Sequence, residues 1–160
     1  MKRIDETKRQ FTLVGLFAAL LLLSHLVLAA PVSAVSGVIE KFSANSFDQT
    51  VQKIKKGITA NRLVLLKELD HQAMMKMVGV NAKKSKSFEV FHPRYGKKIH
   101  AKDLNAFIAV PIRIMVQERG RKVVVTYQEP SALLAPYKGL GGLGKDLDKL
   151  FAQIVDGAVK

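Results

Sequence analysis

The chain has 160 residues, which is enough for one domain of ordinary size. It contains no cysteine, which excludes disulfides, thiolate zinc sites, iron–sulfur clusters and cysteine nucleophiles. The hydrophobic share of 48% and the mean hydropathy of +0.10 exclude a disordered or collagen-like chain. The formal net charge of +13 indicates an anionic partner or surface.

The N-terminal segment predicts export across the cytoplasmic membrane. Basic residues open the chain, and no Asp, Glu, Lys or Arg occurs between Gln10 and Ile39. Leu, Ala, Val and Phe dominate the run from Phe11 to Ala30, and such residues favour membrane insertion by up to about 0.6 kcal/mol each. The basic flank is expected to stay inside, which places the rest of the chain in the periplasm or outside the cell.

The export segment has two possible fates. The small-x-small pattern of Val32-Ser33-Ala34 predicts a signal peptide over residues 1–34, removed after Ala34. The length of the run from Phe11 to Ala30 favours a retained transmembrane helix that anchors the protein. Cleavage removes four basic and two acidic residues and leaves a net charge of +11. In either form, nucleic acid is not an expected partner, and anionic lipid, an acidic polymer, an acidic protein or a low-pH exterior accounts for the charge.

The first half of the exported part predicts two strands and two helices. The first strand spans residues 35–41 with Phe42, and Ser46 with Gln49 forms a capping box that opens a helix. One face of this helix carries Phe47, Val51, Ile54 and Ile58. The run from Leu63 to Leu69 predicts a central strand, buried on both faces over its first four residues. Asp70 then caps a short helix that Gly79 ends, with Met74, Met77 and Val78 on one face.

The second half predicts three more strands and further helices. Residues 87–91 alternate as a third strand, and residues 92–96 turn the chain. Leu104, Phe107 and Ile108 mark a helix that Pro111 stops. Residues 112–116 and 123–127 alternate around a turn at 118–121, which predicts a β-hairpin. A short helix from Pro130, a flexible hinge over residues 139–144 and a last helix follow; the apolar stripe of that helix comprises Leu147, Leu150, Phe151, Ile154 and Val155.

These elements predict an α+β fold, in which about five mostly antiparallel strands pack against helices. We place the folded domain at residues 35–138, and the hinge with its amphipathic helix at 139–160. The order of five short motifs resembles the domain-of-unknown-function 302 family (DUF302) over about residues 38–137. The motifs are Ser46-Phe47-Asp48-Gln49-Thr50, Glu68-Leu69-Asp70-His71-Gln72-Ala73, Phe88-Glu89-Val90-Phe91, Val110-Pro111-Ile112-Arg113 and Tyr127-Gln128-Glu129-Pro130.

The resemblance implies a compact α+β fold and a tendency to form homodimers, and it implies no established activity. Members of the family often carry a Gly-Asn-Pro turn after the third strand. This chain has Phe91-His92-Pro93 there, which keeps the proline and replaces its neighbours. The resemblance therefore strengthens the fold prediction and leaves the function open.

A His/Met cluster offers one candidate chemistry. His71 with Met74, Met75 and Met77, joined by His92 or His100, has the imidazole and thioether ligands that suit copper(I). His and Met also serve as axial ligands of haem iron, although the chain has no Cys-x-x-Cys-His attachment motif. On a helix His71 shares a face with Met75, so the four residues cannot all converge. The alternative is that Met74 and Met77 fill the core, in which case no cofactor is expected.

Asp70, His71 and Tyr127 are the catalytic candidates, as a site for a small anionic substrate. Adjacent residues on a strand point to opposite faces, so a capping Asp70 and a hydrogen-bonded His71 at a dimer or pocket edge explain the pair better. No serine lies in a Gly-x-Ser-x-Gly elbow. Residues 139–144 match G-x-G-x-x-G, but no strand precedes them and only 16 residues follow, which excludes a dinucleotide site.

Basic residues flank the third predicted strand on both sides. They are Lys83, Lys84 and Lys86 before it and Arg94, Lys97 and Lys98 after it. If the two loops converge, they form a surface for anionic lipid headgroups; otherwise they are ordinary solvated lysines and arginines. The sequence as a whole favours a non-catalytic binding or accessory domain, either homodimeric or part of a membrane complex. Copper or haem-iron handling and an enzyme are the two alternatives.

Overall fold

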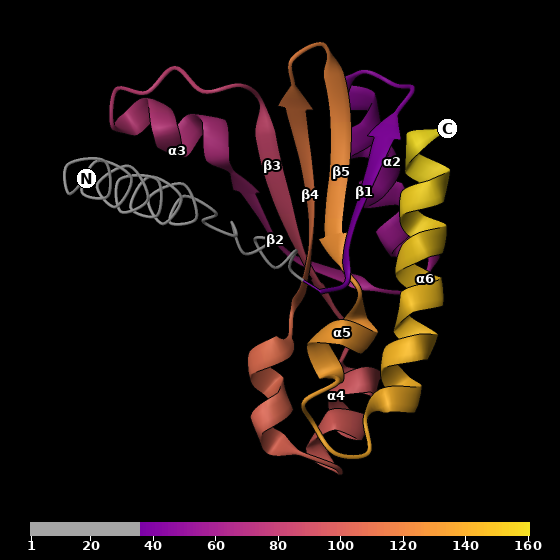
Figure 1. The fold of residues 1–160 in the computed structure, drawn as a ribbon. Helices are drawn as coiled ribbons and strands as arrows, with labels where there is room; N and C mark the ends of the chain where they lie inside the picture. Colours follow the sequence, from indigo (N-terminus) through magenta and orange to yellow (C-terminus); the bar gives the residue numbers. More distant parts are fainter. Residues whose placement is uncertain (1–35) are drawn as a thin grey trace, which may run out of the picture. The chain divides into compact units, whose positions relative to one another are not determined.

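The computed structural model describes residues 36–160, which form a five-stranded antiparallel sheet packed against helices (Figure 1). The strands are β1 (Val38–Ser43), β2 (Val64–Asp70), β3 (Ser85–Phe91), β4 (Ile112–Arg119) and β5 (Lys122–Gln128). The helices are α2 (Phe47–Ala60), α3 (His71–Met77), α4 (Pro93–His100), the 3₁₀ helix η2 (Leu104–Ala109), α5 (Pro130–Leu134) and α6 (Gly141–Val159). The predicted signal or anchor segment lies outside the described residues, and within residues 36–160 no helix is long and apolar enough to cross a membrane.

The strands follow the order β1-β5-β4-β3-β2, so β2 lies at an edge of the sheet. The prediction of a central strand here was therefore wrong. Val64 and Leu66 are 41% and 53% exposed, and a bulge interrupts the pairing with β3 between Leu65 and Lys67. Four consecutive apolar residues indicate burial on both faces only where other elements cover both faces of the sheet, and α2 and α6 cover one face here.

Helices α2 and α6 cover one face of the sheet (Figure 1), and the hydrophobic core lies between these helices and the sheet. The predicted stripe of α2 is buried, with Ile54 and Ile58 fully inaccessible to solvent. The predicted stripe of α6 packs in the same core, although Leu150 is only partly buried there. The alternating residues of β4, including Ile114 and Val116, face these helices. The helical period of the sequence thus sets which faces meet.

Several local predictions are confirmed. Ser46 and Gln49 form the capping box at the start of α2. β4 and β5 form the hairpin, and α5 begins at Pro130. The confirmed signals are short-range, because capping and turn formation depend on residues within one or two turns of each other.

Two segments differ from the prediction. Residues 93–100 form helix α4, capped by His92, where the sequence suggested a turn. Proline is well placed in the first turn of a helix, so the chain turns and continues as a helix. The predicted flexible hinge is partly helical, because α6 begins at Gly141. Gly144 is buried, and a Cβ there would lie 2.6 Å from the Cα of Ser131, so close packing explains this glycine better than flexibility.

The antiparallel register gives the sheet two ends with different structures. At one end, which we call the entry end, the described chain begins at Ser36, and α4, η2 and α5 adjoin the strands. At the other end, which we call the arm end, β2 runs into α3 and the hairpin turns between β4 and β5. The eight residues of β4 separate the two ends by about 25 Å.

Candidate binding site at the end of strand β2

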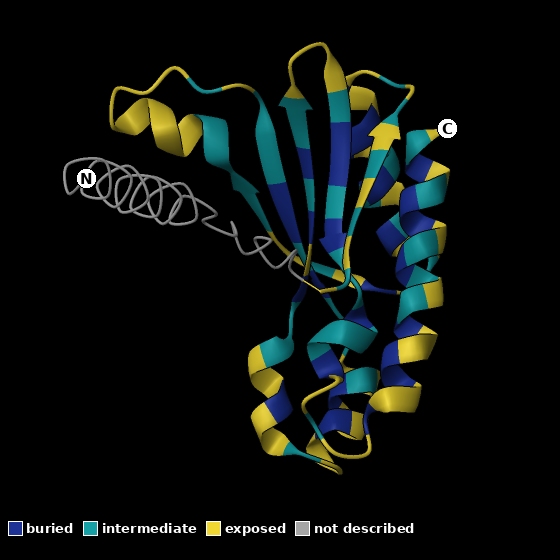
Figure 2. Cartoon of the chain, viewed as in Figure 1, coloured by how far each residue is buried: buried dark blue, intermediate teal, exposed yellow. Residues whose placement is uncertain are grey.

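Helix α3 and the loop after it project from the edge of the sheet, and we call residues 71–84 the arm (Figure 1). No residue of α3 is buried. Met77 is 85% exposed and Val78 70% exposed, and Met74, Met75 and Val80 are also exposed (Figure 2). The interpretation of Met74 and Met77 as core residues was therefore wrong. The apolar residues of this helix recur at helical spacing and form one apolar face, but within residues 36–160 no element packs over that face.

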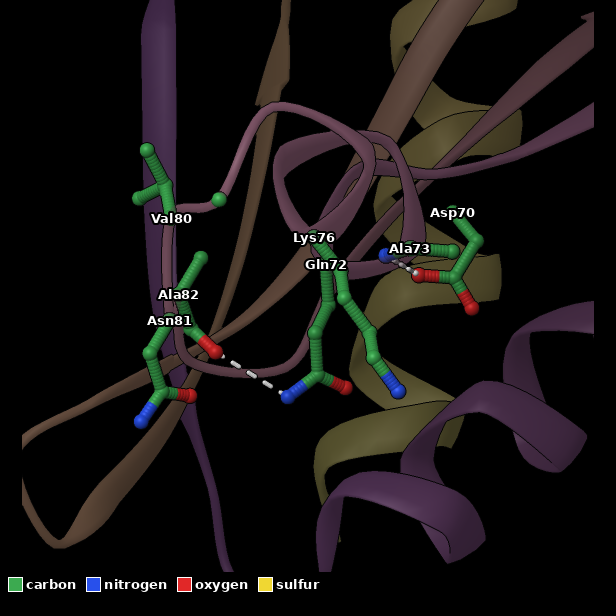
Figure 3. Close-up of a pocket in the computed structure, with 8 residues that line it drawn as sticks. Asp70, Gln72, Ala73, Lys76, Val80, Asn81 and Ala82 are labelled. Atoms are coloured by element: carbon green, nitrogen blue, oxygen red, sulfur yellow. Dashed lines mark hydrogen bonds between the residues drawn. The ribbon is translucent and has the colours of Figure 1, made fainter.

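Asp70 connects the edge strand to the arm. Its Oδ1 accepts a hydrogen bond of 2.9 Å from the backbone N–H of Ala73, so it caps α3 as predicted. Farther along the arm, Nε2 of Gln72 donates to the carbonyl oxygen of Ala82 at 3.0 Å, which ties the returning loop to the helix (Figure 3). These two bonds give the exposed arm a defined shape although it has little core of its own.

A cavity of about 580 Å³ lies between α3 and the returning loop (Figure 3). Its lining comprises Asp70, Gln72, Ala73, Lys76, Gly79, Val80, Asn81 and Ala82. A smaller cavity of about 140 Å³ adjoins it, sharing Asp70 and Gln72. The lining combines a carboxylate, an amine and two amides with apolar groups. It can therefore bind a polar ligand or side chain.

A network of ion pairs lies beneath the arm. The carboxylate of Glu68 accepts from Nζ of Lys55 at 2.8 Å and from Nζ of Lys86 at 2.7 Å, and Oδ2 of Asp70 lies 3.6 Å from the same Lys86 amine. The hydrogen bonds from Lys55 and Lys86 lower the pKa of Glu68, and the hydrogen bond to Glu68 raises the pKa of Lys86. The network joins α2, β2 and β3 at the base of the arm.

His71 fixes the start of α3 to the neighbouring strand. Its Nε2 lies 2.9 Å from Oγ of Ser87, a residue that is only 5% exposed. Ser87 pairs with Leu69, and Lys86 pairs with Asp70, so His71 and Asp70 have partners on opposite faces of the sheet. The structure therefore gives each residue a separate positioning role and forms no acid–base pair between them.

Tyr127, the third catalytic candidate, lies far from both. It stands on β5 at the level of Glu68, three strand spacings or about 14 Å away across the sheet. The side chain is buried beside Phe151, and burial raises the pKa of Tyr127 to about 12. Neither cavity at the arm includes Tyr127 or His71. The structure does not bring the three candidates together.

The His/Met candidates are likewise divided. His92 caps α4 at the entry end by accepting from the backbone N–H of Arg94, and His100 closes the same helix. His92 and His100 lie after the end of β3, whereas His71 lies beside the start of β3. Neither His92 nor His100 therefore lies near the methionines of the arm. In the described part of the chain no three His, Asp or Glu residues gather around a common point. A metal site here would consist of His71 and the arm methionines alone.

The six basic residues do not form one surface. Lys83, Lys84 and Lys86 lie at the arm end, whereas Arg94, Lys97 and Lys98 lie on α4 at the entry end, because β3 runs between the two groups. Lys84 pairs with Asp48, and Lys86 pairs with Glu68. Of the two alternatives left open by the sequence, the two basic segments do not converge, because they lie at opposite ends of one strand.

Sequence reasoning missed the ion-pair network and most of the cavity lining. Glu68 and Lys86 are neighbours across β2 and β3, and only the strand register brings them together. Gln72, Lys76 and Asn81 line the cavity because the chain turns back after Gly79. The sequence signal for that return was Gly79, which has a φ of +78°.

The family of the domain of unknown function DUF302 matches residues 39–157. The chain belongs to the DUF302 family. The match reaches into α6, beyond the resemblance over residues 38–137, so the last helix is part of the family's domain.

The fold resembles that of a solved structure of a DUF302 protein. It is titled "Crystal structure of uncharacterized conserved protein DUF302 from Bacillus stearothermophilus", and it is 12% identical to this chain with a TM-score of 0.72. The match covers 78% of this chain and 99% of that protein. At this identity the likeness extends to the fold alone. No curated protein matches the sequence.

Proposed function

We propose that this DUF302 protein is a non-catalytic binding domain, exported and held at the membrane, in which the arm binds a protein partner of a membrane complex. The observation that carries the proposal is the arm itself, a helix without a buried residue that exposes Met74, Met77 and Val78. A soluble domain gains nothing in stability from such a helix. Exposed apolar side chains at i, i+3 and i+4 are typical of a helix that docks in a groove.

Charge and composition specify the partner's chemistry. Residues 71–84 contain Lys76, Lys83 and Lys84 and no Asp or Glu. The groove that fits the arm is therefore apolar at its floor and acidic at its rim. Methionine side chains adapt to irregular surfaces, which suits a contact of this kind. The five exposed apolar residues are too few to bury the roughly 800 Å² per partner of a stable interface, so the arm is expected to make a transient contact or part of a larger one.

Cross-linking from the arm tests this function. Because the chain has no cysteine of its own, an introduced cysteine is the one site of labelling on it. In the full chain, a Met77→Cys variant carrying a photoreactive group is irradiated in native membranes and compared with Arg121→Cys in the hairpin turn. We expect an adduct to one membrane protein from position 77 only, lost on Val78→Glu. Purified partner and full chain must then bind each other with the same dependence on Val78. Adducts to a second copy of the chain would instead make the arm a homodimer contact, and equal adducts from both positions would contradict the proposal.

A second function, copper(I) or haem-iron handling, is supported by the exposure of the arm methionines beside His71. Nε2 of His71 contacts Ser87, which leaves Nδ1 for a metal ion. Metal analysis of the full chain purified from its own membrane separates the two functions. Stoichiometric copper or iron that disappears on His71→Ala supports metal handling, and metal-free protein that still cross-links through position 77 supports partner binding.

A further inference from the structure

We propose that the entry end of the domain docks on the anionic lipid bilayer through an apolar patch on η2 and the basic residues of α4. The inference rests on the membrane-held form of the proposed function and adds a second surface to it, distinct from the arm. We call the surface made by Arg94, Lys97, Lys98, Lys102, Leu104 and Ile108 the docking face.

Exposed apolar side chains define the centre of this face. Ile108 is 86% exposed and Leu104 60% exposed, which are among the highest values for large apolar residues in the described chain (Figure 2). They lie four positions apart on η2, whose one buried residue is Ala106. Phe107 is 38% exposed. The 3₁₀ helix therefore anchors its backbone with a small residue and presents its large apolar residues to the outside.

Exposed cations lie on the helix next to η2 and in the connection to it. Helix α4 packs against η2 and exposes Arg94, Lys97 and Lys98, and Lys102 lies in the connection between the two helices. From residue 92 to residue 111 the chain has these four basic residues and a single acidic one, Asp103. Within residues 36–160, none of the four cations pairs with a carboxylate, in contrast to Lys84 and Lys86 at the arm end. Unpaired cations around exposed apolar groups match the headgroup and acyl regions of an anionic bilayer.

The path of the chain brings the first described residues to the same end of the domain. The carbonyl oxygen of Gly37 accepts from the backbone N–H of Glu129 at 2.7 Å, so the first described residues lie against the start of α5. Helix α5 in turn contacts η2. If residues 11–30 span the bilayer, the six residues from Ala30 to Ser36 reach at most about 20 Å. In that case Ser36, at the entry end, lies within about 20 Å of the bilayer surface.

The two proposed surfaces are compatible because they lie at opposite ends of the sheet. A domain docked through η2 and α4 directs the arm away from the bilayer, toward the extramembrane part of a partner. Lipid docking thus accounts for the exposed apolar residues at the entry end, and partner binding accounts for those at the arm end, while a single sheet and its helices form one core.

Fluorescence from single introduced cysteines tests the docking face. The full chain is reconstituted into vesicles of phosphatidylcholine, with or without phosphatidylglycerol, with an environment-sensitive dye at Ile108→Cys or at Arg121→Cys. We expect lipid-borne nitroxide to quench the dye at position 108 in the anionic vesicles only, and the dye at 121 in neither. Each cation near an anionic surface contributes about fivefold, so the double change Lys97→Gln and Lys98→Gln lowers the docked-to-undocked ratio about 25-fold. The control variant Arg121→Gln and Lys122→Gln, which also loses two cations, should leave the docked-to-undocked ratio unchanged.

Extraction with alkaline carbonate distinguishes the failure of this inference from the failure of the membrane-held form. A chain that resists extraction while position 108 is not quenched would overturn the docking face and leave the tether intact. A chain released by carbonate whose position 108 is still quenched on anionic vesicles would refute the tether and support the docking face. Equal quenching in neutral and anionic vesicles, or quenching at 121, would overturn the inference.

Discussion

Replacing Glu68 with Gln is expected to weaken the base of the arm in a pH-dependent manner. The change removes the charge that Lys55 and Lys86 contact at 2.8 and 2.7 Å, and it leaves Asp70 as the nearest carboxylate to Lys86. A hydrogen bond to a charged group contributes about 1.5–3 kcal/mol when buried. Glu68 keeps 26% of its side-chain surface exposed, so solvent screens both pairs and we expect a total loss of about 1–2 kcal/mol at pH 7.

The sign of the pH effect follows from the lowered pKa of Glu68. Its hydrogen bonds to Lys55 and Lys86 hold the folded-state pKa below the unfolded value near 4.5. The stabilisation is therefore complete above the unfolded pKa and disappears as the pH falls through the folded pKa. Urea unfolding of the full chain, followed by far-UV circular dichroism at pH 7 and pH 3, measures the difference between wild type and E68Q at both pH values.

A matched variant controls for the general loss of a negative charge. Glu118 lies on β4 and forms no ion pair with another described residue, so E118Q should change the free energy of unfolding by less than about 0.5 kcal/mol. A loss from E68Q that is equally large at pH 3 and pH 7, or equal to that of E118Q, would refute the electrostatic explanation of the network.

Four further changes, one of them a control, test the fold. Gly37→Ala should lower the free energy of unfolding by about 1–3 kcal/mol, because φ is +74° and the added Cβ would lie 2.4 Å from a side chain of α5. Gly157→Ala in α6 is the control: its Cβ meets nothing within 4 Å, so the change should raise the free energy of unfolding by up to about 1 kcal/mol. Thermal unfolding of the two variants measures the difference. Asp70→Ala should cost about 0.5–2 kcal/mol locally and speed hydrogen exchange in the first turn of α3, and unchanged exchange would contradict its capping role. Tyr127→Phe should abolish the absorbance step near pH 12 and reduce the loss of stability above pH 10, since burial raises the pKa of Tyr127 to about 12; a step that persists would contradict that assignment.

The sequence predicted the parts of the fold that depend on local signals. The capping box at Ser46, the hairpin of β4 and β5 and the buried stripe of α6 follow from spacing within one element. The position of a strand within the sheet does not. β2 has the composition of an interior strand, but the strand order leaves it at the edge, and the exposure of Leu66 follows from that order.

The candidate sites show the same division. The capping role of Asp70 was predictable, because it depends on the residues that follow in the chain. The contact of His71 with Ser87, the distance to Tyr127 and the separation of the basic groups all depend on the strand register, which the sequence pattern leaves undetermined. Apolar periodicity at Met74 and Met77 indicated a buried face but did not distinguish the core of this domain from a surface that another molecule covers.

Labelling in intact cells tests the central claim, an exported domain docked at the membrane through its entry end, most directly. A maleimide that cannot cross membranes is added to cells that carry Arg121→Cys or Ile108→Cys in the otherwise cysteine-free chain. We predict that position 121 is labelled without lysis, and that position 108 is labelled only after detergent removes the bilayer. Labelling of neither position until the cells are broken would place the domain in the cytosol, and equal labelling of both in intact cells would leave no docking face; either result would contradict the account.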